Sequence, residues 1–174
     1  MRVYVDATPL YNLGMVGETE LLGSLAGELV VPEAVVAEID VEPAATNLEY
    51  LLEEVDVETQ PQLAGHRERA ARILDDDPDT VDAALIAGVL AEREASDGTP
   101  VCGVISDDRR IRRLADGLGA AVASTFAVVV RTALMDKYFT ASQAKRVLRR
   151  MDGHGLVTTG PLREQAVGDV GGEA

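Results

Sequence analysis

The sequence contains few cysteine, lysine and aromatic residues, and it contains no tryptophan. Its 174 residues include one cysteine, two lysines and six Phe or Tyr side chains. A single cysteine excludes an internal disulfide framework, and so few aromatic rings give poor support for base recognition by stacking. No apolar run approaches the roughly 20 residues that cross a bilayer, and no charged leader precedes the first apolar run. We therefore expect a cytoplasmic protein without a membrane partner.

Basic residues are outnumbered by acidic ones, 16 to 30, which gives a formal net charge of −14. Such a chain has no general attraction for phosphate backbones, so any nucleic acid must be bound by a local surface. The acid-rich, lysine-poor composition suggests the high-salt cytoplasm of a halophilic archaeon. At about 1 M salt the Debye length is roughly 3 Å, and the repulsion between surface charges is largely screened.

Hydrophobic residues make up 47% of the chain, which is enough to form the core of one α/β domain. We expect this domain to span residues 1–157. Residues 158–174 form a C-terminal extension, and their glycine-rich end predicts flexibility.

Short apolar runs and helically spaced runs alternate along the sequence. Strands are expected at residues 3–5, 29–31, 101–105 and 121–123. Helices are expected at residues 9–27, 32–39, 81–94, 109–118, 126–137 and 142–151. Residues 75–79, Asp-Asp-Asp-Pro-Asp, predict a solvated loop. The alternation predicts a mostly parallel central sheet with helices on both faces, which is a three-layer α/β/α sandwich.

Five acidic residues are placed where this fold would bring them together. Asp6 follows the first strand, and Asp107 and Asp108 follow the strand at 101–105. Glu38 and Asp82 lie on predicted helices that can face the same edge. Because the carboxyl ends of parallel strands share one edge of the sheet, we expect a common acidic pocket there. Carboxylates this close repel each other unless a cation is bound, and Mg²⁺ or Mn²⁺ prefers such oxygen ligands.

Each of these acids also has an ordinary structural explanation. Asp6 can be a turn residue at the end of a strand, and Glu38 can be a solvated helix residue. Asp82 can stabilise the positive end of a helix dipole. Either Asp107 or Asp108 can cap the helix that begins at residue 109, which leaves the other available as a ligand. A metal site is favoured only because all five acids are placed where the predicted fold would bring them together.

Four segments, in order, resemble the acidic motifs of PIN-domain nucleases. They are Val-Tyr-Val-Asp-Ala-Thr (3–8), Pro-Glu-Ala-Val-Val-Ala-Glu-Ile (32–39), Asp-Ala-Ala-Leu-Ile-Ala (82–87) and Ile-Ser-Asp-Asp-Arg (105–109). The likeness covers residues 2–157. The segment at 124–131, followed by a basic C-terminal helix, is similar to a small prokaryotic branch with toxin-like members.

The resemblance implies a site and a set of partners. Its catalytic and metal-binding residues would be Asp6, Glu38, Asp82 and Asp108, with Asp107 as a further candidate ligand and Thr8 and Ser106 as polar neighbours. The cofactor would be Mg²⁺ or Mn²⁺. The resemblance also implies RNA as substrate, a possible antitoxin as partner and a homodimer.

Basic side chains are concentrated in one part of the sequence. Residues 105–150 carry ten basic and four acidic side chains, whereas residues 1–104 carry five and 22. Two clusters stand out: Arg109, Arg110, Arg112 and Arg113, and Lys145, Arg146, Arg149 and Arg150. Each cluster can form a salt-bridged helix face or bind RNA phosphates through forked guanidinium donors.

These observations lead to two hypotheses. The first is a metal-dependent ribonuclease, in one version the toxin of a toxin–antitoxin pair. The alternative is a catalytically inactive PIN-like module that binds nucleic acid or serves as a scaffold. In the second case the acids persist only as helix caps and surface charge.

Overall fold

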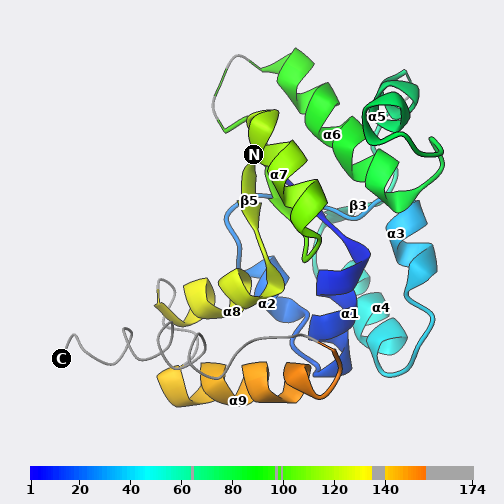
Figure 1. The fold of residues 1–174 in the computed structure, drawn as a ribbon. Helices are drawn as coiled ribbons and strands as arrows, with labels where there is room; N and C mark the ends of the chain where they lie inside the picture. The colour runs from blue at the N-terminus through cyan, green and yellow to red at the C-terminus, as the bar shows by residue number, and fades with distance from the viewer. Residues whose placement is uncertain (64, 97, 99, 135–139, 156–174) are drawn as a thin grey trace.

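The computed structural model describes residues 1–155 except 64, 97, 99 and 135–139 (Figure 1). The predicted extension at 158–174 lies outside the described residues. None of the described helices is long and apolar enough to cross a membrane.

A five-stranded parallel sheet forms the centre of the described structure. Its order is β3-β2-β1-β4-β5. The strands are β1 (Arg2–Val5), β2 (Glu28–Val30), β3 (Val57–Glu58), β4 (Gly103–Ile105) and β5 (Ala121–Ala123). The four predicted strands are thus confirmed to within about two residues at each end.

The helices connect these strands as parallel crossovers require. They are α1 (Ala7–Met15), α2 (Glu20–Gly23), α3 (Glu33–Glu38), α4 (Ala44–Glu54), α5 (His66–Leu74), α6 (Val81–Ala95), α7 (Arg109–Gly117), α8 (Thr125–Leu134) and α9 (Ala141–Asp152). Figure 1 shows α5, α6 and α7 on one side of the sheet and α1, α2, α4 and α8 on the other. This arrangement confirms the three-layer sandwich.

Strand order places a switch point between β1 and β4. The chain runs outward from β1 to β2 and β3, and then returns past β1 to β4 and β5. Right-handed crossovers in opposite directions put the connecting helices on opposite faces. The segments that follow β1 and β4 therefore diverge and leave a crevice at the carboxyl edge of the sheet.

The predicted helix at residues 9–27 is wrong in its extent. It is two helices, α1 and α2, because Gly17 adopts φ +71°, a left-handed conformation that cannot continue an α-helix. The backbone N–H of Gly17 bonds to the carbonyl of Gly14 and so closes the end of α1. The break lets the chain turn back toward β2.

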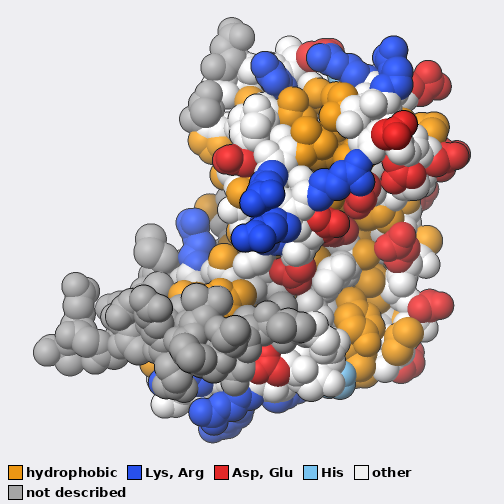
Figure 2. All heavy atoms as spheres, viewed as in Figure 1, with side chains coloured by type: hydrophobic (Ala, Val, Ile, Leu, Met, Phe, Trp, Pro, Cys, Tyr) orange, Lys and Arg blue, Asp and Glu red, His pale blue; other side chains and the backbone are white. Residues whose placement is uncertain are grey.

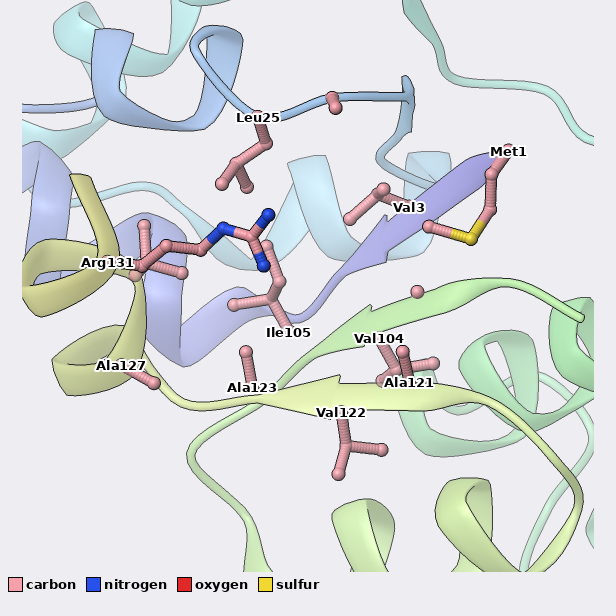
Figure 3. Close-up of a pocket in the computed structure, with 13 residues that line it drawn as sticks. Met1, Val3, Leu25, Val104, Ile105, Ala121, Val122, Ala123, Ala127 and Arg131 are labelled. Atoms are coloured by element: carbon pink, nitrogen blue, oxygen red, sulfur yellow. The ribbon is translucent and has the colours of Figure 1, made fainter. Parts of the chain in front are cut away.

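An apolar groove of about 300 Å³ lies on the sheet face formed by β1, β4 and β5 (Figure 3). Gly103, Ala121 and Ala123 line it with little or no side chain, which leaves the space open. In Figure 3 the Arg131 side chain reaches over Ile105 from α8. No carboxylate of the described residues lines this groove, so it is separate from the predicted acidic site.

Candidate metal centre

A cleft of about 310 Å³ opens at the carboxyl edge of the sheet, at the switch point. It is lined by Asp6, Ala7, Thr8, Glu38, Asp76, Thr80, Val81, Asp82 and Asp108. The structure thus brings together four of the five predicted acids, from four separate segments, along with the predicted polar neighbour Thr8.

Asp6 is the most buried of these acids, with 6% of its surface exposed. It is the N-cap of α1, and its Oδ1 accepts a 2.7 Å hydrogen bond from the N–H of Ala7. Its Oδ2 accepts a 2.6 Å hydrogen bond from the Ser106 hydroxyl. Both oxygens are therefore fixed in direction before any ligand binds.

Ser106 links Asp6 to Asp108. The Ser106 hydroxyl is fully buried, donates to Asp6 and accepts the backbone N–H of Asp108 at 3.0 Å. Asp108 is the N-cap of α7, and its Oδ1 accepts from the N–H groups of Arg110 and Ile111 at 2.5 and 3.3 Å. The sequence analysis expected one of the two aspartates to be this cap; it is Asp108, which also lines the cleft.

Asp82 and Glu38 reach the cleft from helix ends. Asp82 is the second residue of α6, whose N-cap Thr80 accepts from the N–H of Ala83 at 3.2 Å. Glu38 is the last residue of α3 and is exposed. Asp6, Asp82 and Asp108 therefore all stand at helix N-termini, where the helix dipole favours negative charge.

Burial and repulsion between the carboxylates nevertheless disfavour negative charge in the cleft. Burial raises the pKa of Asp82, and the charges of Asp6, Asp108 and Asp76 raise it further, against a smaller opposing effect of Arg110. Burial likewise raises the pKa of Asp6, although the hydrogen bonds from Ser106 and Ala7 oppose the shift. A bound cation would relieve this repulsion.

Asp76 belongs to the cleft as well, and the sequence analysis missed it. Residues 75–79 do form a loop, as predicted, but Asp76 is not merely solvated, because it lines the cleft and acts on Asp82. Asp75 has φ 56°, a left-handed C-cap that turns the chain after α5. The indication in the sequence that Asp76 belongs to the cleft was weak, since four aspartates in five residues are typical of a solvated loop.

Asp107 does not line the cleft. Its Oδ1 accepts from the N–H of Thr125 at 2.8 Å, and its Oδ2 accepts from the Thr125 hydroxyl at 2.6 Å. Oδ2 also accepts from the side-chain amide of Asn12 at 3.0 Å. The structure therefore directs the oxygens of this predicted ligand toward α1 and α8 and not into the cleft, although its charge still helps to raise the pKa of Asp6.

The donor set of the cleft fits a hard divalent cation. Every charged group that lines it is a carboxylate, and Mg²⁺ and Mn²⁺ prefer oxygen ligands. Within the described part of the chain, no group of three or more His, Cys, Asp and Glu side chains is close enough to hold an ion directly. Mg²⁺ is bound in proteins through one or two carboxylates and retains several waters, so a wide, solvated cleft suits it.

Two of the four arginines of α7 form hydrogen bonds to backbone carbonyls and so stabilise the fold. Arg112 donates to the carbonyl of Ser106 at 2.6 Å, and Arg110 donates to the carbonyl of Leu74 at the end of α5. Arg109 and Arg113 are exposed and lie four residues apart on one side of α7. Figure 2 shows Lys and Arg side chains gathered over α7, directly beside acidic side chains.

The basic cluster of α9 lies elsewhere. Arg150 donates to the carbonyl of Val16 at 2.6 Å and pairs with Glu18 at 3.7 Å. Val16 follows the far end of α1, roughly 15 Å along the helix from Asp6 at about 1.5 Å per residue. The structure therefore does not bring Lys145, Arg146, Arg149 and Arg150 to the cleft, and Figure 2 shows a separate basic group along the edge where α9 lies.

A parallel β3-β2-β1-β4-β5 sheet between helical layers, with carboxylates gathered at its switch point, defines a three-layer α/β domain with an acidic cleft. A comparison with family models identifies the family: the DUF3368 family, described as a PIN domain, matches residues 2–171. The chain belongs to this PIN-domain family, and the resemblance stated from the sequence is confirmed. Neither the comparison with curated proteins nor that with solved structures gave a match.

Proposed function

We propose that the protein is a Mg²⁺- or Mn²⁺-dependent ribonuclease that hydrolyses phosphodiester bonds. The observation that supports this proposal best is the cleft itself, where Asp6, Glu38, Asp82 and Asp108 line one solvated space. The raised pKa values of Asp6 and Asp82 indicate that these charges are not compensated by the protein alone.

The acids would have different roles in binding the metal, according to how firmly hydrogen bonds fix each carboxylate. Asp6 and Asp108, joined through Ser106, form the fixed side of the site. Asp82 and Glu38 lie at the ends of α6 and α3, where their carboxylates can adjust to the ion. When bound, the metal supplies a water of lowered pKa and positive charge that stabilises the leaving oxygen.

Arg109 and Arg113 are our candidates for holding the RNA. They are exposed on the helix that begins at Asp108, so a phosphate bound there lies close to the cleft. Arginine donates two parallel hydrogen bonds to phosphate oxygens, which positions a strand without reading its bases. The proposed substrate is accordingly RNA cut with little sequence recognition by stacking.

Membership of the PIN-domain family supports further parts of the proposal. We propose a toxin role in the cytoplasm, with an antitoxin that binds at the acidic cleft and with a homodimer as the active form. A short open reading frame adjoining the gene would support the toxin role.

One observation favours the alternative of an inactive binding or scaffold module. Asp6 and Asp108 both cap helices, and Asp6 already has hydrogen bonds to both oxygens. Acids used in this way stabilise the fold whether or not a metal binds.

Assays of the cleavage of labelled RNA distinguish the two functions. They compare the unaltered protein with Mn²⁺ and with a chelator, and then the Asp6→Asn and Asp108→Asn variants with Mn²⁺. Asp116→Asn is the matched control, because Asp116 is an exposed acid of α7 that does not line the cleft. We expect cleavage by the unaltered protein and the control, and at least a 100-fold loss in the two cleft variants, since each removes a charge on which transition-state stabilisation depends. Cleavage that survives chelation or both substitutions would disprove the ribonuclease.

A further inference from the structure

We infer that Asp107 is a positioning residue, which fixes the turn that carries Asp108 relative to the helix that Asp6 caps, and so orients the two acids toward the cleft. The inference rests on the proposed function, because it concerns the same cleft. It assigns Asp107 a role that differs from the ligand role expected from the sequence.

Two parallel links join α1 to the turn between β4 and α7. The first runs from Asp6 to Ser106, at 2.6 Å. The second runs from Asn12 to Asp107, at 3.0 Å. Because Ser106 and Asp107 are consecutive, whereas Asp6 and Asn12 lie more than one helical turn apart, the two links fix both the distance and the angle between α1 and this turn.

A third contact extends the arrangement to α8. Thr125, the first residue of α8, donates both its N–H and its hydroxyl to the Asp107 carboxylate. Thr125 is fully buried, and only 3% of Asn12 is exposed. Asp107 therefore ties together three elements through donors that water cannot reach.

Burial of these donors explains why Asp107 stays away from the cleft. A rotation of its carboxylate toward a metal would leave the Thr125 and Asn12 donors without acceptors. Each buried donor left without a partner costs about 1–3 kcal/mol. The sum opposes a ligand role and favours the position that the structure shows.

Substitution by asparagine distinguishes positioning from ligation. In Asp107→Asn, the amide oxygen can still accept from the Thr125 N–H, and the amide nitrogen can donate to the Thr125 hydroxyl oxygen and, once the Asn12 amide is flipped, to Asn12. A positioning residue therefore tolerates this change, whereas a metal ligand loses the charge that the ion needs. Asp107→Ala and Asn12→Leu remove the second link, between Asn12 and Asp107, and leave the Asp6–Ser106 link in place.

Calorimetric titration with Mn²⁺ alone, in the absence of RNA, is the test. We expect Asp107→Asn to retain the affinity of the unaltered protein, and Asp107→Ala and Asn12→Leu to lose affinity by about 10–100-fold, as is usual when the groups that orient metal ligands are removed. Asp116→Asn again controls for the loss of one charge. Thermal unfolding without metal identifies the temperature at which each variant is folded for the titration.

Two results would overturn the inference: an Asp107→Asn variant that binds Mn²⁺ as weakly as Asp107→Ala, or an Asn12→Leu variant that binds as tightly as the control. Should Asp107→Ala not fold, Asn12→Leu and Asp107→Asn still decide the question. Binding of Mn²⁺ without RNA cleavage would overturn the proposed function alone. Absence of Mn²⁺ binding by the unaltered protein would overturn both.

Discussion

At the scale of single residues, the carboxylates of the cleft serve the fold and the site together. Asp6 caps α1 and Asp108 caps α7, so each lowers the free energy of the folded state through hydrogen bonds to backbone N–H groups. Asp82 has no such bond among those that the structure shows, and burial together with nearby acids makes its environment unfavourable for a charge. Repulsion from three acids and burial outweigh the favourable helix N-terminus, since the net effect is a raised pKa.

Asp82→Asn should stabilise the metal-free protein at neutral pH. Because the pKa of Asp82 is higher in the folded than in the unfolded state, its contribution to stability is full below the unfolded pKa and is lost as pH rises through the folded pKa. Asparagine does not titrate, so the difference in unfolding free energy between variant and parent should grow from pH 4 to pH 7. Chemical denaturation in the presence of a chelator measures it.

The same variant should lose the stabilisation that Mn²⁺ gives to the unaltered protein. Asp79→Asn, an exposed acid of the neighbouring loop, is the matched control. A difference that shrinks with rising pH, or a Mn²⁺ effect that persists in Asp82→Asn, would contradict this account of the cleft.

At the scale of elements, the position of α6 depends on a close contact with β1. Tyr4 is fully buried, and its ring occupies the space where a Cβ on Gly88 would lie. The contact brings α6 against the sheet, and α6 carries Asp82 in its first turn. Packing in the middle of the helix thus sets where an acid at its end is placed.

Gly88→Ala should destabilise the protein by about 1–3 kcal/mol, because the added methyl overlaps the Tyr4 ring and forces α6 away from the sheet. Gly117→Ala on α7 is the control, since nothing lies within 4 Å of the added Cβ. Alanine is the better helix former by up to about 1 kcal/mol, so this variant should be unchanged or more stable. Urea unfolding of both variants measures the effect, and equal stabilities would refute the packing argument.

At the scale of the whole molecule, a formal net charge of −14 is combined with a basic helix beside an acidic cleft. The long-range field repels RNA, so binding depends on short-range contacts at α7. On α9, by contrast, Arg150 bonds to the carbonyl of Val16 at the far end of α1, and the described residues that line the cleft include no arginine of α9.

Arg109→Gln with Arg113→Gln should therefore weaken binding of single-stranded RNA and reduce its salt dependence. Each lost phosphate contact lowers the slope of log affinity against log salt by about 0.7. Fluorescence anisotropy in the presence of a chelator, over a range of KCl concentrations, gives the slope. Arg146→Gln on α9 should leave it unchanged, and a larger effect of this variant would move the RNA site to α9.

The sequence by itself determined the layers of the fold and most of the acids. Apolar periodicity, acids at strand ends and acids on predicted helices are local signals, and they predicted a parallel sheet and a cleft containing Asp6, Glu38, Asp82 and at least one of Asp107 and Asp108. The Gly17 break between α1 and α2 was not predicted, because a glycine within an apolar run can either continue or end a helix.

Only the tertiary structure decided between chemically identical neighbours. Asp107 and Asp108 are the same residue type in consecutive positions, yet one bonds to α1 and α8 and the other caps α7 and lines the cleft. The structure also places Asp76 in the lining of the cleft and places the basic helix α9 away from the cleft. The physical reason is that a side chain's direction depends on which buried donors surround it, and those donors come from parts of the chain that only the folded packing brings near.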